Sequence, residues 1–484
     1  MRLLPTLNIL ARVALLFSFT LLVPIALAWL GQDAGFLPLA EALVLSIVSS
    51  LLVLLLTHPF RRELHVRDGF LLVVGIWLLL PLSAAAPLML YDPHMSFTYG
   101  YFEGMAGLTT TGSTAIADLD ALPASLNLWR HMLSWLGGMG VIVLAVAVLP
   151  MLGVGGMQMF KAEMPGPIKD AKLKPRIRET ARNLWLVYSG LTVLCMLLLK
   201  LAGMTWFDAV CHAMTAISLG GISTHNDSVG YFNSPGIEVV LVIFMLAGAT
   251  NFATHYVALS RRSLLTYWRD SEFKTMIAVL VLAALGLAGY LTWQNIYPDY
   301  ETSLRHVTFN LISIATDSGY ATADFAAWPL FVPLLMLFLS CFTACAGSTG
   351  GGIKMFRALV LIKEAGRQFT TLLHPNAVKP VQINGRSVPP PMIFAVLGFI
   401  SLYVISMVVL TFVLLLTGLD FLTAFSAVVA SLNNTGPGLG AIGPSANFSI
   451  FGPSQVWVCT FAMLLGRLEI FSVLILFTPA FWRN

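Results

Sequence analysis

Charged residues are scarce in this chain of 484 residues. Only 10% of them are Asp, Glu, Lys or Arg, whereas an ordinary soluble domain carries about 25%. Apolar residues make up 57%, and several apolar runs reach about 18 residues, enough to cross a hydrocarbon core of roughly 30 Å. This composition excludes a soluble enzyme, a disordered chain and a nucleic-acid-binding protein. It predicts an all-α polytopic protein of the lipid bilayer, whose length allows about ten transmembrane helices.

Cysteine is also rare, and motifs for catalysis or cofactor binding are lacking. Five cysteines occur, and no His or further Cys accompanies Cys341 and Cys345, the one closely spaced pair. We interpret them as small packing residues rather than as a metal or redox site. No dinucleotide fingerprint, catalytic constellation or DDxxD-like metal–phosphate cluster occurs. We therefore expect no bound cofactor, and an enzyme such as a membrane-embedded lipid transferase is disfavoured.

Ten apolar runs are predicted to cross the membrane. They lie near 8–30, 39–57, 69–91, 129–152, 184–203, 236–260, 275–297, 329–346, 390–417 and 454–481. The first run also resembles a secretory signal, but it is longer than the apolar core of such a signal and another span follows closely. Shorter apolar pieces lie between some of the runs.

Lys and Arg are concentrated on one side of this predicted membrane. Four connections and the two termini hold 23 of the 27 basic residues, and all lie on the same side if ten spans begin and end together. The positive-inside rule makes that side the cytoplasm, so both termini are predicted to be cytoplasmic. The opposite face carries many acidic residues. They could attract cations to a pore mouth. Their position could equally have no function, because the positive-inside rule restricts Lys and Arg but not Asp and Glu. The basic connections are 61–68, 161–182, 261–274 and 354–386.

Four comparable units follow the first two spans. In each unit a long apolar run precedes a short apolar segment of about a dozen residues, a stretch rich in Gly, Ser and Thr, and a second long run. The short segments lie near 96–108, 207–217, 303–314 and 420–431, and the polar stretches contain Gly112, Gly221, Gly319 and Gly436. The predicted boundaries are 1–68 for two N-terminal helices, then 69–160, 161–260, 261–362 and 363–484 for four repeats.

These units predict a pore. The short segments cannot span a bilayer and fit re-entrant helices, and non-helical backbone at membrane depth is tolerated only inside protein or beside a water-filled cavity. Four such loops around an axis bring together carbonyl oxygens that can replace the hydration shell of an ion. Neutral oxygens suit a weakly hydrated monovalent cation better than Ca²⁺ or Mg²⁺. We therefore expect four pseudo-symmetric helix–pore loop–helix repeats around a central ion path.

Four phrases of the sequence resemble the Trk/Ktr/HKT superfamily of potassium transporters, and within it most closely the bacterial TrkH/TrkG type. The resemblance covers essentially the whole chain, including the two additional N-terminal spans. The phrases are Gly107-Leu108-Thr109-Thr110-Thr111-Gly112, Gly220-Gly221-Ile222-Ser223-Thr224-His225, Ala346-Gly347-Ser348-Thr349-Gly350-Gly351-Gly352-Ile353-Lys354 and Asn433-Asn434-Thr435-Gly436-Pro437-Gly438.

The resemblance implies a subunit of the bacterial inner membrane that passes K⁺, its substrate ion, into the cell through a selectivity filter. It also implies a homodimer with one pore in each protomer, and a cytoplasmic TrkA-type regulatory subunit that binds NAD or another nucleotide. The residues implied to hold K⁺ at the filter are Thr110, Thr111, Gly112, Leu219, Gly220, Gly221, Asp317, Ser318, Gly319, Asn434, Thr435 and Gly436.

One filter position departs from the pattern expected of the family. Asp317 lies two residues before its glycine, where a Thr is expected. Its carboxylate either adds a counter-charge near the ion or points behind the filter and braces the loop. We favour bracing, because the filter uses main-chain oxygens.

A glycine-rich break interrupts the apolar run from 329 to 363, which is too long for one span. Gly350, Gly351 and Gly352 each disfavour helix by roughly 1 kcal/mol relative to Ala, which indicates a flexible break within the membrane. A phosphate-binding loop is excluded, because it requires Gly-Lys-Ser/Thr. The resemblance implies an intramembrane loop that obstructs the pore beneath the filter. Lys354 belongs to this predicted gate or simply reaches the cytoplasmic surface.

Arg467 lies inside the last apolar run, where a charge is a functional hypothesis by default. Glu469 is two residues away and points elsewhere on a helix, so each is expected to pair across helices. Arg467 is either part of a buried ion pair or, as the resemblance favours, an electrostatic barrier near the ion path. A symporter that couples K⁺ to H⁺ or Na⁺ also stays open. His131, His212 and His255 could relay protons, although lone intramembrane histidines more often cap or bridge helices.

Overall fold

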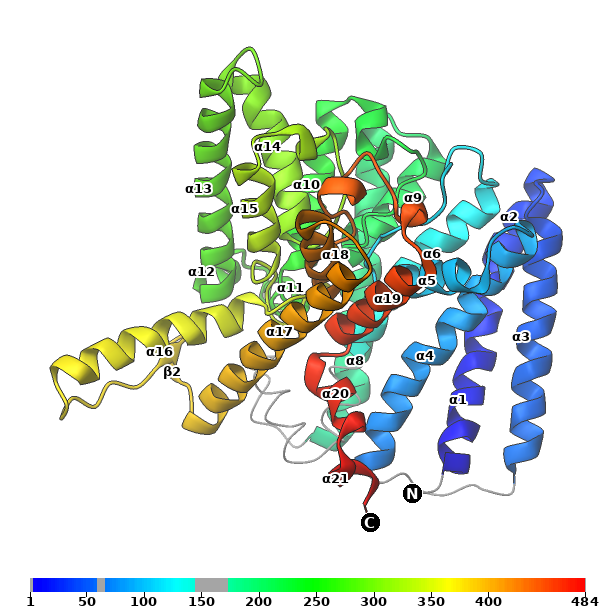
Figure 1. Cartoon of the computed structure of the whole chain (residues 1–484), viewed down its shortest axis with the longest axis horizontal. Helices are drawn as coiled ribbons and strands as arrows, with labels where there is room; N and C mark the ends of the chain where they lie inside the picture. The colour runs from blue at the N-terminus through cyan, green and yellow to red at the C-terminus, as the bar shows by residue number, and fades with distance from the viewer. Residues whose placement is uncertain (1–2, 59–65, 144–172, 484) are drawn as a thin grey trace.

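A computed structural model describes residues 3–58, 66–143 and 173–483, and these residues are mostly helical (Figure 1). Six described helical segments are long and apolar enough to cross a membrane. They are α1 (Leu3–Ser18) continued through η1 (Phe19–Leu21) into α2 (Leu22–Gly31), then α3 (Phe36–Thr57), α4 (Val66–Tyr91), α8 (Leu173–Leu201), α13 (Ser271–Trp293) and α17 (Pro390–Leu416). The prediction of an all-α polytopic membrane protein is confirmed.

Two further apolar segments are sharply bent. Helix α10 (Pro235–Ala249) meets α11 (Phe252–Arg261) at 101°, and α19 (Pro453–Arg467) meets the segment formed by α20 (Ile470–Leu474) and η10 (Ile475–Phe477) at 114°. The sequence predicted spans near 236–260 and 454–481 and did not reveal these bends. The reason is local: Asn251 leaves the helix and its side chain accepts a hydrogen bond from the Ala253 amide, while Glu469 has a φ of 56°. Continuous apolar patterning does not reveal such breaks, because tertiary partners satisfy the freed backbone groups.

The four predicted short segments are helices that end inside the protein. They are α5 (Phe97–Leu108), α9 (Trp206–Ser218), α14 (Tyr300–Ala315) and α18 (Phe421–Asn433). Three of them begin at a side-chain cap, since Thr205, Asp299 and Asp420 each accept a hydrogen bond from a backbone amide in the first turn. Small residues line their buried faces and let the backbones approach closely, among them Ala209, Ala213, Ala424 and Ala427.

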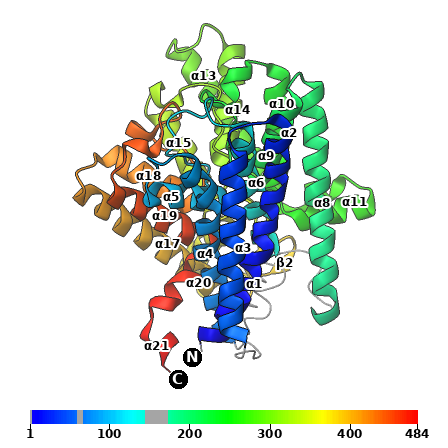
Figure 2. The same cartoon turned by 90° about the vertical axis from the view of Figure 1, so that its right-hand side faces the viewer.

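The packing of these short helices closes a ring. Each contacts the two longer helices of its own repeat and the second helix of the preceding repeat, which include α6 (Ala124–Val143) and α15 (Phe331–Ser340). Thus α9 packs on α6, α14 on α10, α18 on α15, and α5 returns to α19. Helices α1 to α3 stay outside this ring, at one edge of the molecule against α4 and α6 (Figures 1 and 2).

The two ends of the molecule carry different connections. Both termini lie at the lower end in Figure 1, and the same half holds α12 (Leu265–Arg269), α16 (Met355–Leu373), the antiparallel hairpin of β1 (Gln382–Ile383) and β2 (Arg386–Ser387), and α21 (Pro479–Trp482). The loops that follow the short helices lie at the other end. They contain the short turns η6 (Ser228–Phe232), η7 (Phe325–Ala327), η8 (Gly440–Ile442) and η9 (Phe448–Ile450).

Some predictions fall on residues outside the described ranges. These are the repeat boundary between 160 and 161, the first part of the basic connection 161–182, most of the connection 61–68, and the end of the predicted span 129–152. The remaining repeat boundaries stay predictions as well.

Candidate functional site

The four glycines predicted for the filter form a closed ring. Each glycine faces a carbonyl oxygen of the next repeat, and that oxygen belongs to the residue just before the next repeat's own ring glycine. The glycine of the fourth repeat faces the first repeat in the same way. The distance from an added Cβ atom to that oxygen is 2.2 Å from Gly112 to Gly220, 1.9 Å from Gly221 to Ser318, 2.2 Å from Gly319 to Thr435 and 2.7 Å from Gly436 to Thr111. No side chain fits at such distances, so glycine is required at all four positions.

The backbone has the same conformation in all four filter segments. The glycines have φ values between 55° and 101°, and the residue two positions earlier is also left-handed. Those earlier φ values are 55° at Thr110, 57° at Leu219, 66° at Asp317 and 59° at Asn434. A left-handed backbone costs roughly 1–2 kcal/mol in a residue with a side chain, and such strain persists only where the surrounding structure imposes it. The repeats therefore agree in backbone although these four side chains differ.

Polar side chains of the short helices hold the segments that follow the filter. In three repeats the side chain lies nine residues before the glycine, and in the fourth it lies ten before. The bonds join Glu103 to Thr114 Oγ1 (2.7 Å) and to the Ala115 amide (2.5 Å), His212 Nε2 to Ser223 Oγ (3.1 Å), Asn310 to the Thr322 amide (3.1 Å) and Ser426 to the Leu439 amide (2.8 Å). This role was not predicted from the sequence. Their common spacing to the glycine is the signal that could have revealed it.

Glu103 carries a second interaction that links two elements of the first repeat. Its Oε2 atom lies 3.3 Å from Nε of Arg130 on α6, and both side chains are buried. Because a buried carboxylate is costly without a counter-charge, Arg130 stabilises the residue that holds the loop after Gly112. Arg130 also lines the cavity outside the filter.

That outer cavity is lined by all four filter glycines, which places it directly outside the ring. Its described lining includes Arg130 and His225 but no Asp or Glu. His225 stacks on Tyr231 with ring centroids 3.6 Å apart, and its Nδ1 lies 2.8 Å from a carboxylate oxygen of Asp120. Asp120 therefore contacts this wall from behind His225, and no acidic side chain is part of the described lining.

Asp317 connects the filter to the glycine-rich segment. One carboxylate oxygen accepts a hydrogen bond of 2.8 Å from Thr435 Oγ1, and the other accepts one of 3.1 Å from the Gly351 amide. Both oxygens are thus occupied by protein donors, and the side chain is fully buried. These contacts are those expected of a bracing side chain.

The segment 341–354 between α15 and α16 is a loop that packs against the ends of three short helices. Thr349 Oγ1 donates to the Ile217 carbonyl at the end of α9 (3.0 Å). A Cβ atom on Gly351 would lie 2.0 Å from the Asn433 carbonyl at the end of α18, and one on Gly350 would lie 3.3 Å from Asp317 beyond α14. The loop therefore lies immediately beneath the filter, and its glycines permit the close approach.

Arg467 reaches this loop from α19. Its Nη1 donates to the Thr349 carbonyl (2.8 Å) and its Nη2 to the Gly137 carbonyl on α6 (3.0 Å). In the described part of the chain no carboxylate lies within ion-pair distance of it, so the buried ion pair is corrected to a guanidinium held by two backbone carbonyls. Glu469 does pair across helices, with Arg357 of α16 at 2.7 Å.

Comparison with known proteins agrees with this geometry. The family model described as "TrkH: Cation transport protein" matches residues 39–484. The chain belongs to the TrkH family. It is 43% identical over 99% of both chains to the Trk system potassium uptake protein TrkH of Salmonella typhimurium, and likewise 43% identical over 99% of both to that of Halomonas elongata. The crystal structure of the potassium transporter TrkH from Vibrio parahaemolyticus matches with a TM-score of 0.91 and 41% identity, covering 100% of both chains. The predicted family resemblance is confirmed, and these relatives are transporters rather than enzymes.

Lys354 of this TrkH-family chain turns back onto the loop instead of only reaching the surface. Its Nζ donates to the Ser348 carbonyl at 3.3 Å, and its side chain is half-buried. It also has a φ of 73° at the start of α16, where the chain leaves the loop. The interpretation that Lys354 simply extends to the cytoplasmic surface is therefore corrected.

Of the three intramembrane histidines, His212 and His255 each bond to both backbone and a side chain, whereas His131 bonds to a backbone carbonyl alone. His131 Nδ1 lies 2.7 Å from the Asn127 carbonyl, and His255 contacts the Ala247 carbonyl and the Tyr267 hydroxyl, both at 2.8 Å. His212 joins its own helix to the segment after the filter. Within the described residues no group of three His, Cys, Asp or Glu side chains is arranged to hold a metal ion.

Proposed function

We propose that this TrkH-family chain passes K⁺ into the bacterial cell as the translocating subunit of a Trk-type uptake system. The observation that carries the proposal is the closed ring of four glycines and four carbonyl oxygens contributed by four repeats. Oxygens arranged from four sides can replace the hydration shell of a monovalent cation. The relatives named as potassium uptake proteins support K⁺ as that cation.

In this proposal each repeat contributes three residues to the filter, namely the ring glycine and the two residues before it. The boundaries of the repeats are those predicted from the sequence. Main-chain oxygens hold the ion, so Leu219 and Asn434 serve as well as Thr110 at equivalent positions. The helical ends of α5, α9, α14 and α18 add partial negative charge beneath the ion. The polar bonds from Glu103 and its counterparts keep the oxygens in place.

In this proposal the gate is the loop 341–354. Its gating residues are Gly350, Gly351, Gly352 and Lys354, and Arg467 holds the loop through its hydrogen bond to Thr349. The loop packs against the ends of three short helices, which supports a closed path beneath the filter. Arg467 adds positive charge there and opposes cations electrostatically. Opening requires breaking its bonds to the loop and to α6.

The assembly is proposed on the family resemblance. The chain forms a homodimer with one pore in each protomer, and a cytoplasmic TrkA-type subunit that binds NAD or another nucleotide controls the loop. Both termini face the cytoplasm of the inner membrane, which the distribution of Lys and Arg supports. The chain itself holds no cofactor in this proposal.

A K⁺ symporter is the second candidate. His131 and His212 lie with ring centroids 6.1 Å apart, close to the filter segment of the second repeat. A mechanism coupled to protons could use this pair, so the experiment below includes a pH gradient.

Cation flux into liposomes containing the full chain tests the proposal. K⁺, Rb⁺, Na⁺ and Li⁺ are compared, with and without pH or Na⁺ gradients, for the wild type, Gly319→Ser and the matched control Gly289→Ser. Gly289 lies on α13 with open space around its Cβ position, so this control leaves the filter intact. We expect K⁺ and Rb⁺ to pass without a second gradient, and only Gly319→Ser to alter selectivity. Flux that needs a second gradient favours the symporter, and equal passage of all four ions in all three proteins contradicts the filter.

A further inference from the structure

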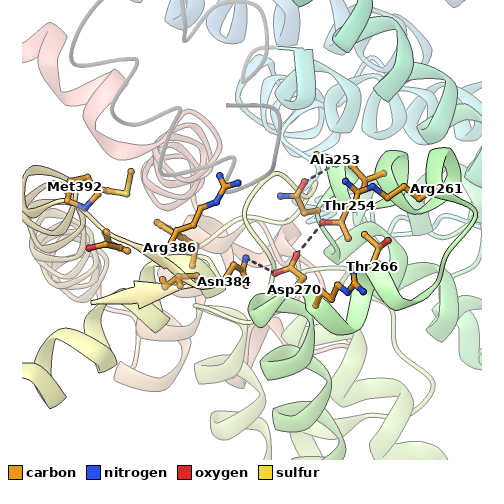
Figure 3. A pocket seen from close by; sticks show the side chains of 16 residues that line it. Ala253, Thr254, Arg261, Thr266, Asp270, Asn384, Arg386 and Met392 are labelled. Carbon is orange, nitrogen blue, oxygen red and sulfur yellow. Dashed lines mark hydrogen bonds between the residues drawn. The ribbon is translucent and has the colours of Figure 1, made fainter. Parts of the chain in front are cut away.

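A cavity separate from the ion path lies among elements of the half of the molecule that holds both termini (Figure 3). It lies between α11, α12, the β1–β2 hairpin and the start of α17, and no proposed filter residue lines it. Apolar side chains form part of its wall, among them Val257, Phe356, Val388 and Met392.

Three arginines line this cavity and give it a positive charge. Arg261 and Arg386 lie on opposite sides of it in Figure 3, and Arg269 is the third. All three side chains are exposed, and in the described part of the chain none forms an ion pair. Asp270 is the one acidic residue of the lining, which leaves an excess of two positive charges.

Asp270 forms no ion pair with these arginines, because its oxygens accept hydrogen bonds from neutral donors. One oxygen accepts a hydrogen bond from the Glu272 amide at 3.0 Å and caps α13, and the other accepts one from Thr254 Oγ1 at 3.2 Å (Figure 3). The arginines therefore remain available to a ligand. Guanidinium groups bind phosphate oxygens in a bidentate geometry, so a phosphate group is the anion that this lining suits.

The surroundings of the cavity place it at the level of lipid headgroups. Beside its arginines, the segment containing α12 exposes Leu264, Leu265 and Trp268 at 78%, 63% and 59%. Large apolar side chains next to Arg are typical of segments that lie in the membrane interface. Acyl chains can cover these side chains while the headgroup enters the cavity.

We infer that this cavity binds a phosphate-bearing anion, supplied by the headgroup of an anionic phospholipid in the adjacent leaflet. The phosphate contacts Arg261, Arg269 and Arg386, and the hydroxyls of Thr266 and Ser387 are within the same lining. Basic pockets between helices at the cytoplasmic side are suited to such headgroups. The inference goes beyond the proposed K⁺ transport and rests on it only for the cytoplasmic orientation.

The cavity also adjoins the glycine-rich loop, at its middle and at its C-terminal end. Asn251 lines it and caps α11, and the next residue, Phe252, donates from its amide to the Gly347 carbonyl at 3.1 Å. Phe356 lines it from the first turn of α16, immediately after the loop. A bound headgroup therefore holds one segment that bonds to the middle of the loop and one that follows its end, and acidic lipid is expected to alter ion flux.

Lipid binding to the purified full chain in detergent tests the inference without any transport measurement. Native mass spectrometry compares phosphatidylglycerol with phosphatidylcholine of the same acyl chains, for the wild type and for Arg261→Gln, Arg269→Gln and Arg386→Gln singly and together. Arg262→Gln is the matched control, because Arg262 is exposed beside the cavity but does not line it. We expect a preference for phosphatidylglycerol that weakens about fivefold for each cavity arginine removed and is unchanged in the control.

Two results would overturn the inference. Equal phosphatidylglycerol binding by the wild type and the cavity variants excludes the site, and displacement of the lipid by millimolar inorganic phosphate or glycerol phosphate identifies a soluble phosphate ligand instead. If the triple variant does not fold, the single variants supply the same comparison. Quenching of Trp268 fluorescence by brominated phosphatidylglycerol, with Trp268→Phe as the blank, provides an independent measurement in the wild type.

Discussion

The filter and the loop beneath it are built on opposite plans. Each repeat contributes one filter segment, and all four segments share the same backbone conformation and the same kind of polar support. The segment 341–354 has fourteen residues and comes from the third repeat alone, whereas α10 and α19 are each followed by a break of two residues. Coordination of an ion requires equal contributions from several sides. Obstruction of its path requires only one segment that can move.

The two regions also differ in what holds them. The filter is fixed by its own backbone geometry, since a side chain at any ring glycine would overlap a neighbouring carbonyl. The loop is fixed by side chains outside it, chiefly Arg467 of the fourth repeat and Asp317 of the third. Substitutions should therefore damage selectivity in the first region and alter gating in the second.

The largest effect is expected at the ring itself. Gly319→Ala places a methyl group 2.2 Å from the Thr435 carbonyl at a φ of 87°. Both the overlap and the left-handed backbone displace the oxygen, so K⁺ flux or K⁺/Na⁺ selectivity in liposomes should fall at least about tenfold. Gly289→Ala on α13 is the control. Unchanged selectivity in Gly319→Ala would contradict the assignment of the filter.

The next largest effect is expected at the loop. Arg467→Ala removes two charge-assisted hydrogen bonds, each of about 1.5–3 kcal/mol, that hold Thr349 and α6 together. K⁺ flux should rise about tenfold while K⁺/Na⁺ selectivity is retained. Arg305→Ala removes the ion pair with Glu238 at the opposite end and should leave flux unchanged. Equal flux in Arg467→Ala and the wild type would count against both the barrier and the latch.

Asp317 contacts both the filter and the loop. Asp317→Asn keeps the shape but weakens the bonds to Thr435 and Gly351. If the carboxylate braces the loop, the substitution costs the closed loop about 1 kcal/mol of hydrogen bonding. Flux should then rise a few-fold, and selectivity should be unchanged. Loss of K⁺ selectivity would instead show that the charge acts on the ion. Asp324→Asn, in an outer turn, is the control.

The smallest effect is expected at the outer end of a short helix. Asp420 caps α18, and hydrogen bonds from the Thr423 side chain and amide lower its pKa below the ordinary value. Asp420→Ala should reduce the free energy of unfolding by about 1 kcal/mol at pH 7. Because the pKa is lowered in the folded protein, this stabilisation is present above the ordinary Asp pKa and disappears as the pH falls through the lowered value.

Thermal unfolding in detergent at pH 7 and at acidic pH measures this difference. Asp227→Ala is the matched control, since Asp227 precedes η6 without a side-chain capping bond. Equal melting temperatures for Asp420→Ala and Asp227→Ala at pH 7 would exclude the capping contribution.

Much of the architecture is determined by the sequence alone, because it depends on local patterns. Length and hydrophobicity of a run decide whether it spans, and the segments 96–108 and 207–217 were too short to do so. The corresponding helices α5 and α9 end within a residue or so of those predictions. The glycines could also be chosen from the sequence, because each follows a short segment in a repeated arrangement.

Only the tertiary structure decided what these segments contact. Gly112 faces Gly220, and Gly436 faces Thr111, across separations of 108 and 325 residues that no local pattern encodes. The bends after α10 and α19, the role of Glu103 and the choice of carbonyls by Arg467 arise in the same way. A buried polar group must be satisfied by whichever partner the packing brings near, and for Arg467 those partners are the Thr349 and Gly137 carbonyls of two other repeats.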